Sequence, residues 1–450
     1  MSASTGAHET RFTRASLAVV ALCFATIMVD GYDLIIYGAV VPSLLGYQEW
    51  SLTPEQVGFI GSAALVALLI GSLISGPVSD RIGRRKVTIF CVSSFSIAMG
   101  LCAIAPTPEL FGVFRFLAGL GLGGSIPTVS ALVIEHSPLK RRSFAYALMF
   151  IGYPVGGVLS SALAIPLIPA FGWQVMFWVG LLPLVLLVPL LYRFMPESVS
   201  FLLANDRRQE AEEITRRFDL PIESERADAA LREGEAPAQK STLSALRQVF
   251  SKRYVAATLL FMVASFQGLL LVYGLNSWLP GIMSEAGYPL SSSLSFLLVL
   301  NVGAIVGALL ASAAADRFGS KPLTVACFLL GAASVALLSI QPVALVVYIL
   351  VAVAGLGSVG TQILVNAWVT RYYPVESRAT GVGWAIGFGR AGAIFGPILG
   401  GLVVGSGLAF EWNFYAFVIP ALIGAMIALL VPRSPADRAA TSEARTAPSE

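Results

Sequence analysis

Twelve long apolar stretches recur along almost the whole of this 450-residue chain and constrain its fold more than any other feature. Most of them match the roughly 20 residues that an α-helix needs to cross about 30 Å of hydrocarbon. Because the bilayer interior offers no water to backbone groups, such stretches fold as helices. The composition, 56% hydrophobic and 12% charged, lies far outside that of a soluble globular protein. We therefore predict an all-α integral membrane protein with twelve transmembrane helices.

The apolar stretches form two groups of six, separated by one long polar segment. We predict helices at residues 15–45, 55–79, 87–105, 109–135, 143–169, 174–193, 254–282, 291–315, 322–340, 343–370, 379–406 and 412–431. The predicted domains are a cytoplasmic N-terminus (1–14), an N-terminal six-helix bundle (15–193), a cytoplasmic central loop (194–253), a C-terminal six-helix bundle (254–431) and a disordered cytoplasmic tail (432–450). The central loop is rich in Glu, Arg and Ala and is expected to form a tether with short amphipathic helices.

The two groups repeat each other at a constant offset, since Asp316 follows Asp80 by 236 positions. The same offset relates Asp80-Arg81-Ile82-Gly83 to Asp316-Arg317-Phe318-Gly319, Gly119, Gly121 and Gly124 to Gly355, Gly357 and Gly360, and Tyr37-Gly38 to Tyr273-Gly274. Repeated halves in a polytopic protein predict two pseudo-symmetric bundles that rock about a substrate site between them.

Lysine and arginine gather in alternate connections between the predicted helices. They follow the second, fourth, eighth and tenth helices, whereas the connections on the opposite side contain none. By the positive-inside rule, both termini and the central loop face the cytoplasm. We expect a multi-pass protein of the inner (cytoplasmic) membrane that does not bind nucleic acid.

The first apolar stretch carries two acids, Asp30 and Asp33. A carboxylate at the bilayer centre costs roughly 2.5–3.5 kcal/mol on insertion scales, so it is expected to have a function. The two acids lie on one face of a helix, and Tyr37 extends that face by a turn. Their counterparts in the second half are Phe266 and Leu269, so ion chemistry is expected in the first half only. This pattern predicts a proton or cation site in a coupled transporter.

Two arginines fall within predicted helices, Arg115 in the fourth and Arg390 in the eleventh. A permanently charged guanidinium inside a membrane needs an anionic partner. For Arg115 the candidates are Asp30, Asp33 or a substrate carboxylate. Arg390 is expected to hold an anionic ligand bidentately, or alternatively to bridge to one of the same two acids.

Further candidates for substrate contact are polar and aromatic, and Tyr37 in the first predicted helix is one of them. Gln267, Tyr273 and Asn276 lie in the seventh predicted helix, and Trp384 and Phe388 flank Arg390. Gln362, Asn366 and Asn301 are of the same kind, although an isolated amide in a membrane helix more often bonds to a neighbouring helix.

The connection after the second helix contains the motif Gly76-x-x-x-Asp80-Arg81-x-Gly83-Arg84-Arg85, and Asp316-Arg317-x-Gly319 is its degenerate copy. The motif resembles the signature loop of the major facilitator superfamily, which implies that superfamily's fold and a role in gating the cytoplasmic side. Asp80 is expected to cap a neighbouring helix N-terminus. Glu135 is expected to pair with the basic residues of this loop, and Arg378 to act as a gate or a topogenic charge.

Within that superfamily the chain resembles the aromatic acid:proton symporters, carriers of benzoate-type and hydroxybenzoate-type acids. The resemblance rests on Asp30-Gly31-Tyr32-Asp33, the signature loop, Pro196-Glu197-Ser198, the seventh-helix segment from Tyr273 to Pro280, and Gly383-Trp384-x-x-Gly387-x-Gly389-Arg390. It implies roles for Asp30 and Asp33 in proton coupling and for Arg115 and Arg390 in activity. The expected partners are an aromatic acid, protons and membrane lipid, with the protein acting as a monomer.

The sequence is also compatible with other substrates. A carrier of another organic anion, such as a dicarboxylate, or of a sugar is the nearest alternative. An enzyme is not expected, because the chain has only two histidines, His8 and His136, and no metal-ligand cluster or nucleophile–base pair. No cofactor is expected. A receptor would need a folded sensory or output domain, and the sequence offers none.

Overall fold

A computed structural model describes residues 12–138, 141–218, 242–341 and 343–432, apart from the side chains of 242, 243, 316, 375 and 376. Twelve helices in these ranges are long and apolar enough to cross a membrane, which confirms the predicted number. Their bounds are α2 Arg14–Leu45, α3 Pro54–Ile82, α4 Arg84–Ala103, α5 Pro108–Gly123 with α6 Ser125–Glu135, α7 Arg142–Phe171, α8 Gln174–Phe194, α13 Val255–Glu285, α14 Leu290–Phe318, α15 Ser320–Leu338, α16 Ala344–Gly355 with η2 Leu356–Gly360 and α17 Thr361–Tyr372, α18 Val375–Gly405, and α19 Trp412–Leu430. Most of the predicted N-terminus and tail lies outside the described residues.

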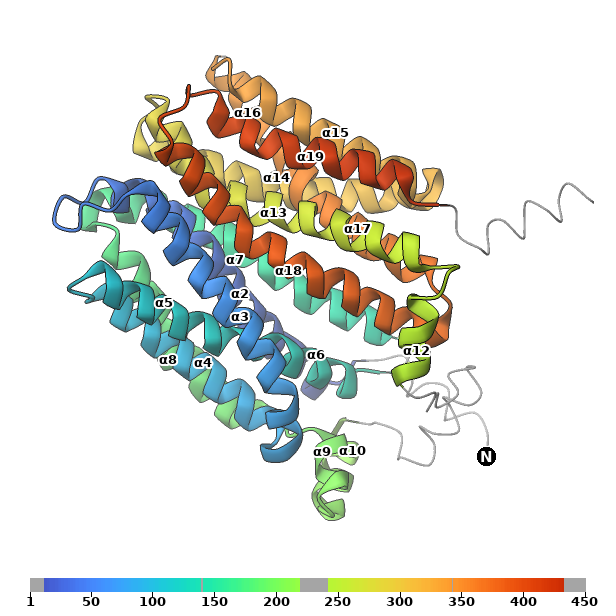
Figure 1. Ribbon diagram of the computed structural model, residues 1–450. Helices are drawn as coiled ribbons and strands as arrows, with labels where there is room; N and C mark the ends of the chain where they lie inside the picture. The colour runs from blue at the N-terminus through green and yellow to red at the C-terminus, as the bar shows by residue number, and fades with distance from the viewer. Residues whose placement is uncertain (1–11, 139–140, 219–241, 342, 433–450) are drawn as a thin grey trace, which may run out of the picture. The chain divides into compact units, whose positions relative to one another are not determined.

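The chain forms two compact units (Figure 1). The first runs to Pro237 and also takes in Asn276–Asn301 and Val404–Ser406; the remaining segments form the second. The two ends of α13 therefore belong to different units.

Close helix packing in the first unit depends on glycines. A Cβ added to Gly31 of α2 would lie 1.9 Å from the backbone oxygen of Tyr153 in α7, and one added to Gly119 of α5 would lie 2.1 Å from that of Ala64 in α3. Small residues at such contacts let helix backbones approach each other closely, the usual basis of packing between membrane helices.

The repeat predicted from the sequence appears as an irregularity at the equivalent place of one span in each unit. The fourth span is interrupted at Gly124, between α5 and α6, and the tenth contains the π-turn η2, which ends at Gly360. The packing repeats as well, since Gly121 lies against the backbone of Cys91 and Gly357 against that of Cys327. The glycines that repeat in sequence therefore occupy equivalent places in the two six-helix repeats.

Short helices of the central segment are also present: α9 (Val199–Ala204), α10 (Arg208–Phe218) and α12 (Thr242–Val249). Val199, Leu202 and Ala211 form a small apolar core between α9 and α10. Figure 1 shows this pair at the end of the first unit where α3 turns into α4. The predicted short helices are confirmed, while residues 219–241 lie outside the described part of the chain.

Candidate functional site

A buried ion pair joins two helices of the first unit. Arg115 of α5 donates from Nη1 to Oδ1 of Asp33 in α2. Asp33 is 5% exposed and Arg115 2% exposed, so water does not screen the two charges. Asp30, a turn earlier on α2, is buried as well. Of the partners predicted for Arg115, the structure selects Asp33.

Uncharged groups complete the surroundings of Arg115. Its guanidinium carbon lies 5.3 Å from the ring centre of Tyr37, a distance typical of a cation–π contact. Nη1 is also 3.7 Å from the sulfur of Met99. The Tyr37 hydroxyl donates to the backbone oxygen of Val57, which fixes the ring. The structure therefore brings Asp33, Tyr37 and Arg115 together, as their predicted helix faces require.

One donor of the arginine remains unused. Arg115 Nε is buried and has no hydrogen-bond acceptor among the described residues. A guanidinium binds a carboxylate best through two parallel N–H groups. Arg115 thus binds Asp33 while keeping a further donor that an incoming anion can take.

The second unit contains the other predicted arginine. Arg390 of α18 donates from Nη1 to the hydroxyl of Tyr273 in α13 at 3.3 Å. The two helices meet closely, because a Cβ on Gly392 would lie 2.0 Å from the backbone oxygen of Phe266. Two residues predicted on different helices, Tyr273 and Arg390, are therefore in direct contact.

The predicted aromatic residues of α18 differ in their surroundings. Phe388 stacks obliquely on Phe266, with ring centres 6.0 Å apart. Trp384 meets Phe250, just after α12, edge to face at 5.2 Å. Phe388 and Trp384 are each 43% exposed within the chain itself. Phe388 lies beside the α13–α18 contact, whereas Trp384 lies toward α12.

Four of the five predicted amides are buried, and the fifth, Asn366, is half-buried. Asn276 accepts a hydrogen bond at 3.1 Å from Nδ2 of Asn301 within the first unit, the helix-to-helix contact expected of such residues. Gln267 belongs to the second unit, as does Gln362, which donates to Asn366 at 3.0 Å. The predicted substrate-binding residues are thus divided: Tyr37, Arg115 and Asn276 in the first unit, and Gln267, Tyr273, Trp384, Phe388 and Arg390 in the second.

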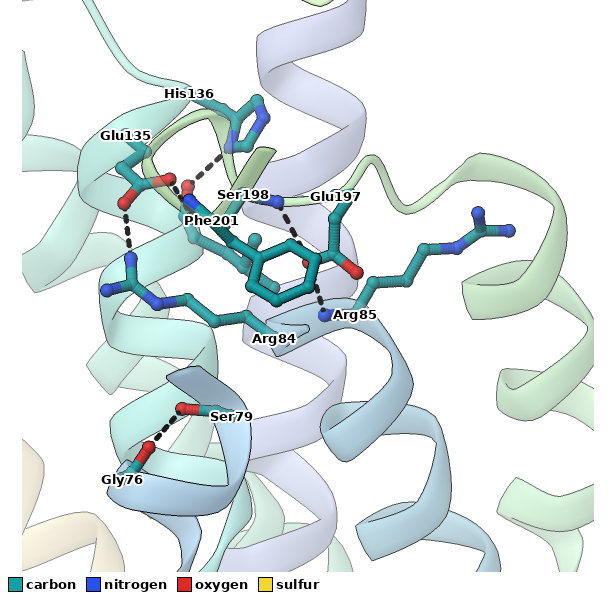
Figure 2. Close-up of polar contacts among 10 residues, drawn as sticks. Gly76, Ser79, Arg84, Arg85, Glu135, His136, Glu197, Ser198 and Phe201 are labelled. Atoms are coloured by element: carbon teal, nitrogen blue, oxygen red, sulfur yellow. Dashed lines mark hydrogen bonds and ion pairs between the residues drawn. The ribbon is translucent and has the colours of Figure 1, made fainter. Parts of the chain in front are cut away.

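A polar network joins the signature loop to the end of α6 and to the residues just before α9, as Figure 2 shows. Arg84 at the start of α4 pairs with Glu135 at the end of α6. Ser198 then donates to the other oxygen of Glu135 at 2.7 Å. The expected pairing of Glu135 with this loop is confirmed.

Glu197 caps α4. Its Oε1 accepts hydrogen bonds from the backbone N–H of Arg85 at 3.0 Å and of Ser198 at 2.9 Å (Figure 2). A carboxylate at a helix N-terminus satisfies a free N–H group and interacts favourably with the helix dipole. Glu197 and Ser198 were not among the predicted site residues, although Pro196-Glu197-Ser198 stood out in the sequence as part of the resemblance.

The prediction that Asp80 caps a helix is wrong. Asp80 is exposed and makes no hydrogen bond or ion pair within the described ranges. Asp80 lies in the last turn of α3, which continues to Ile82, and its side chain is exposed there instead of packing against the N-terminus of another helix. Gly76 is helical too, and the turn itself is made by Gly83, whose φ of 101° favours glycine.

The remaining predicted gating residues make few contacts. Arg81 and Arg317 are exposed, and Arg378 is half-buried on α18. The side chain of Asp316 lies outside the described residues.

Between α17 and α18, burial raises the pKa of Tyr373 to about 12. Its phenol therefore stays neutral and keeps its 2.7 Å hydrogen bond to Thr258.

The described part of the chain has twelve membrane-length helices in two repeated sets, and the first set contains a buried acid–arginine pair. These features define a membrane carrier. The sequence model of the Major Facilitator Superfamily matches residues 22–313 and 293–450, and the chain belongs to that superfamily.

Relatives with named activities are similar over nearly their whole length. The chain is 39% identical to the benzoate transport protein of Acinetobacter baylyi over 94% of its own length and 91% of that protein. It is 37% identical to the gentisate transporter of Corynebacterium glutamicum, over 91% of the chain and 86% of that protein. The 4-hydroxybenzoate transporter PcaK of the same Acinetobacter strain is 32% identical, over 93% and 92%. The resemblance drawn from the sequence is confirmed, and the chain is a carrier rather than an enzyme.

Solved structures agree on the fold. A D-xylose–proton symporter matches with a TM-score of 0.73 at 19% identity, covering 93% of this chain and 97% of that one. A bacterial homolog of the human lysosomal transporter Spinster matches with a TM-score of 0.74 at 16% identity, covering 94% and 98%. At such low identity these likenesses support the architecture alone.

Proposed function

We propose that this protein is a proton-coupled symporter that imports an aromatic carboxylate across the inner (cytoplasmic) membrane by alternating access, with both termini in the cytoplasm. Relatives named for benzoate, gentisate and 4-hydroxybenzoate transport support the substrate class. The observation that carries the coupling is the buried pair of Asp33 and Arg115. A carboxylate inside a membrane helix is the group expected to exchange a proton in a coupled carrier.

Charge explains why a proton is needed. An aromatic carboxylate is an anion at neutral pH, and a potential negative inside opposes its entry by about 2.3 kcal/mol per 100 mV. One accompanying proton cancels the moving charge, and a second lets the potential assist uptake.

Proton binding and anion binding are linked through Arg115. A proton from the outside neutralises Asp33, or Asp30 beside it, and weakens the hold of Asp33 on the arginine. The guanidinium is then available to the substrate carboxylate, and its Nε–H is already without an acceptor among the described residues. Arg390, which donates to the Tyr273 hydroxyl in the second unit, is the second arginine to which we assign a role in transport of the anion.

Release follows from the lower proton activity of the cytoplasm. When the acid loses its proton, the carboxylate of Asp33 competes again for Arg115, and the substrate loses its counter-charge. The same pair thus prevents the carrier from returning with a proton but no substrate. Coupling arises because neither charge is stable alone in a buried place.

The test is uptake of radiolabelled benzoate and 4-hydroxybenzoate by cells expressing Asp33→Asn or Arg390→Ala. Both variants should lose protonophore-sensitive uptake. Glu109→Gln, which neutralises an exposed acid on the same helix as Arg115, is the matched control and should keep it. Undiminished, protonophore-sensitive uptake by both variants would reject the assignment.

A further inference from the structure

The segment that leads into α13 is basic and contains no acid. Residues 242–254, which comprise α12 and the turn after it, include Arg247, Lys252 and Arg253 but neither Asp nor Glu. All three basic side chains are exposed, and none pairs with an acid in the part of the chain that the structure describes. The segment therefore presents an uncompensated positive charge at the start of a membrane-length helix.

Helix α12 is fixed to the second unit by its apolar side. Val249 is fully buried and Leu246 is half-buried. The Thr258 hydroxyl, in the first turn of α13, donates to the backbone oxygen of Val249 at 2.9 Å. The turn is closed by the backbone N–H of Val255, which donates to the oxygen of Ser251 at 2.8 Å. The basic residues are thus held in place at the start of α13.

The position of α12 brings its exposed side to the membrane surface. Figure 1 shows α12 across the end of the second unit, beside the starts of α13 and α18, and not in line with either span. A helix placed in this way lies in the plane of the interface, where basic residues meet lipid headgroups. Phe250 is 37% exposed and packs edge to face on Trp384 at 5.2 Å. An exposed aromatic ring at this level is typical of the membrane–water interface.

The positive-inside rule does not by itself account for this composition, because Asp and Glu contribute little to membrane orientation. Helix α10, also in the central segment, carries three arginines together with three glutamates. A topogenic requirement is therefore compatible with acids, whereas a surface that binds anionic headgroups excludes them.

We propose that α12 and the turn after it form a binding surface for anionic phospholipids. Arg247, Lys252 and Arg253 hold the phosphate groups, and Phe250 contacts the upper part of the acyl chains. Each Lys or Arg near an anionic membrane surface contributes about fivefold in affinity, and a zwitterionic headgroup offers no net charge to attract them. This surface lies outside the proposed transport site and does not depend on which substrate is carried.

Lipid bound at this surface stabilises the second unit. Helix α12 is joined through Thr258 to α13, and the Tyr373 hydroxyl, just before α18, lies 2.7 Å from that of Thr258. A ligand that binds only the folded protein raises its melting temperature by mass action. The lipid preference can therefore be measured as a thermal shift.

The experiment uses the full-length protein in micelles of a neutral detergent, titrated with phosphatidylglycerol or with phosphatidylcholine of the same acyl chains. At tenfold above its half-effective amount, phosphatidylglycerol should raise the melting temperature by about 3–6 °C. Phosphatidylcholine should not raise it. Arg247→Gln, Lys252→Gln and Arg253→Gln should each increase the half-effective amount about fivefold, and the triple variant about a hundredfold. Salt of about 0.5 M should weaken the effect on the wild type.

The matched control is Arg208→Gln/Arg216→Gln/Arg217→Gln on α10, which removes the same charge from exposed positions and should keep the full shift. Arg247→Lys/Arg253→Lys should also keep it, because the charge is retained. If the triple variant does not fold, the three single variants decide the outcome.

The proposal is overturned if the α12 variants respond to phosphatidylglycerol as the wild type does, or if the α10 control loses as much. An equal shift with glycerol phosphate, which has the headgroup chemistry without acyl chains, would show an ordinary phosphate site and not a lipid surface. A protein that shows the lipid shift but transports no aromatic acid would instead reject the proposed function alone.

Discussion

At the scale of single residues, Asp33 and Arg115 behave as one unit rather than as two charges. Each is buried, and each supplies the other's counter-charge. Removing one partner of a buried pair leaves an uncompensated charge, which costs more than removing both. The consequences for stability and for transport can therefore be separated by experiment.

Asp33→Asn should lower the free energy of unfolding by about 3–5 kcal/mol, because it leaves Arg115 charged and unpartnered by an acid. The double variant Asp33→Asn/Arg115→Gln should recover most of that loss and still not accumulate substrate. Thermal unfolding in detergent measures the first effect, and uptake into liposomes the second. A single variant as stable as the wild type would mean that the pair is not buried in the working protein.

Tyr273 receives the hydrogen bond of Arg390 and is predicted to position it. Tyr273→Phe should raise the half-saturating substrate concentration roughly 2–13-fold, the effect of losing one hydrogen bond of about 0.5–1.5 kcal/mol. Arg390→Ala should abolish transport instead. Tyr415→Phe, on the partly exposed face of α19, is the control that should change neither value. Equal losses in Tyr273→Phe and Tyr415→Phe would exclude the positioning role.

At the scale of helices, the packing of α2 on α7 depends on Gly31. Gly31→Ala places a methyl group 1.9 Å from the backbone oxygen of Tyr153 and should destabilise the protein by about 1–3 kcal/mol. The matched control is Gly387→Ala, whose Cβ would meet no atom of the described chain within 4 Å. That change should be neutral or slightly stabilising, since alanine favours helix. Melting temperatures compare the two, and equal shifts would show that α2 and α7 do not meet at Gly31.

The N-terminus of α4 provides a second test at this scale. Glu197→Gln weakens the cap on Arg85 and should cost about 0.5–2 kcal/mol. Hydrogen exchange of the first α4 amides should speed up, and Asp80→Asn should leave it unchanged because Asp80 is exposed. A larger effect of Asp80→Asn than of Glu197→Gln would show that Glu197 does not cap α4.

The helices themselves could be predicted from the sequence because a membrane-spanning helix requires a long, continuous run of apolar residues. Pairings between helices could be predicted only where few partners exist. Arg115 needed an acid, and two lay in the first helix, so the sequence left Asp30 and Asp33 open until the structure selected Asp33. Glu197 could not be predicted as a cap, since it reaches Arg85 across 112 positions through tertiary packing.

The internal repeat could not predict the local backbone geometry of the two spans, and the reason is again tertiary packing. A shared offset predicted equivalent glycine positions in the fourth and tenth spans, but not that one span would break and the other form a π-turn. Such a choice depends on how the neighbouring helix packs, with Phe95 facing Gly121 in one unit and Gly331 facing Gly357 in the other. Sequence periodicity carries no information on that fit.

At the scale of the whole molecule, the two repeats share an architecture but not their charges. The acids Asp30 and Asp33 lie in the first unit and have apolar counterparts, Phe266 and Leu269, in the second. Arg390, in the second unit, has Pro154 at the equivalent position of the first. Under the proposed function, the proton-exchanging acids belong to one repeat, whereas each repeat carries one of the two arginines.

That division predicts a transport cycle in which a pH gradient drives accumulation but is not needed for exchange. In liposomes that are one pH unit more acidic outside, 4-hydroxybenzoate should accumulate up to about tenfold, because one proton per substrate transfers the 1.4 kcal/mol of that gradient. A protonophore should reduce accumulation to equilibrium and leave counterflow intact, since exchange moves substrate and proton together in both directions. Glu109→Gln should behave as the wild type, and Asp33→Asn/Arg115→Gln should not accumulate under any gradient. Accumulation that survives the protonophore, or that a sodium gradient drives alone, would show that the buried carboxylate does not carry the coupling proton.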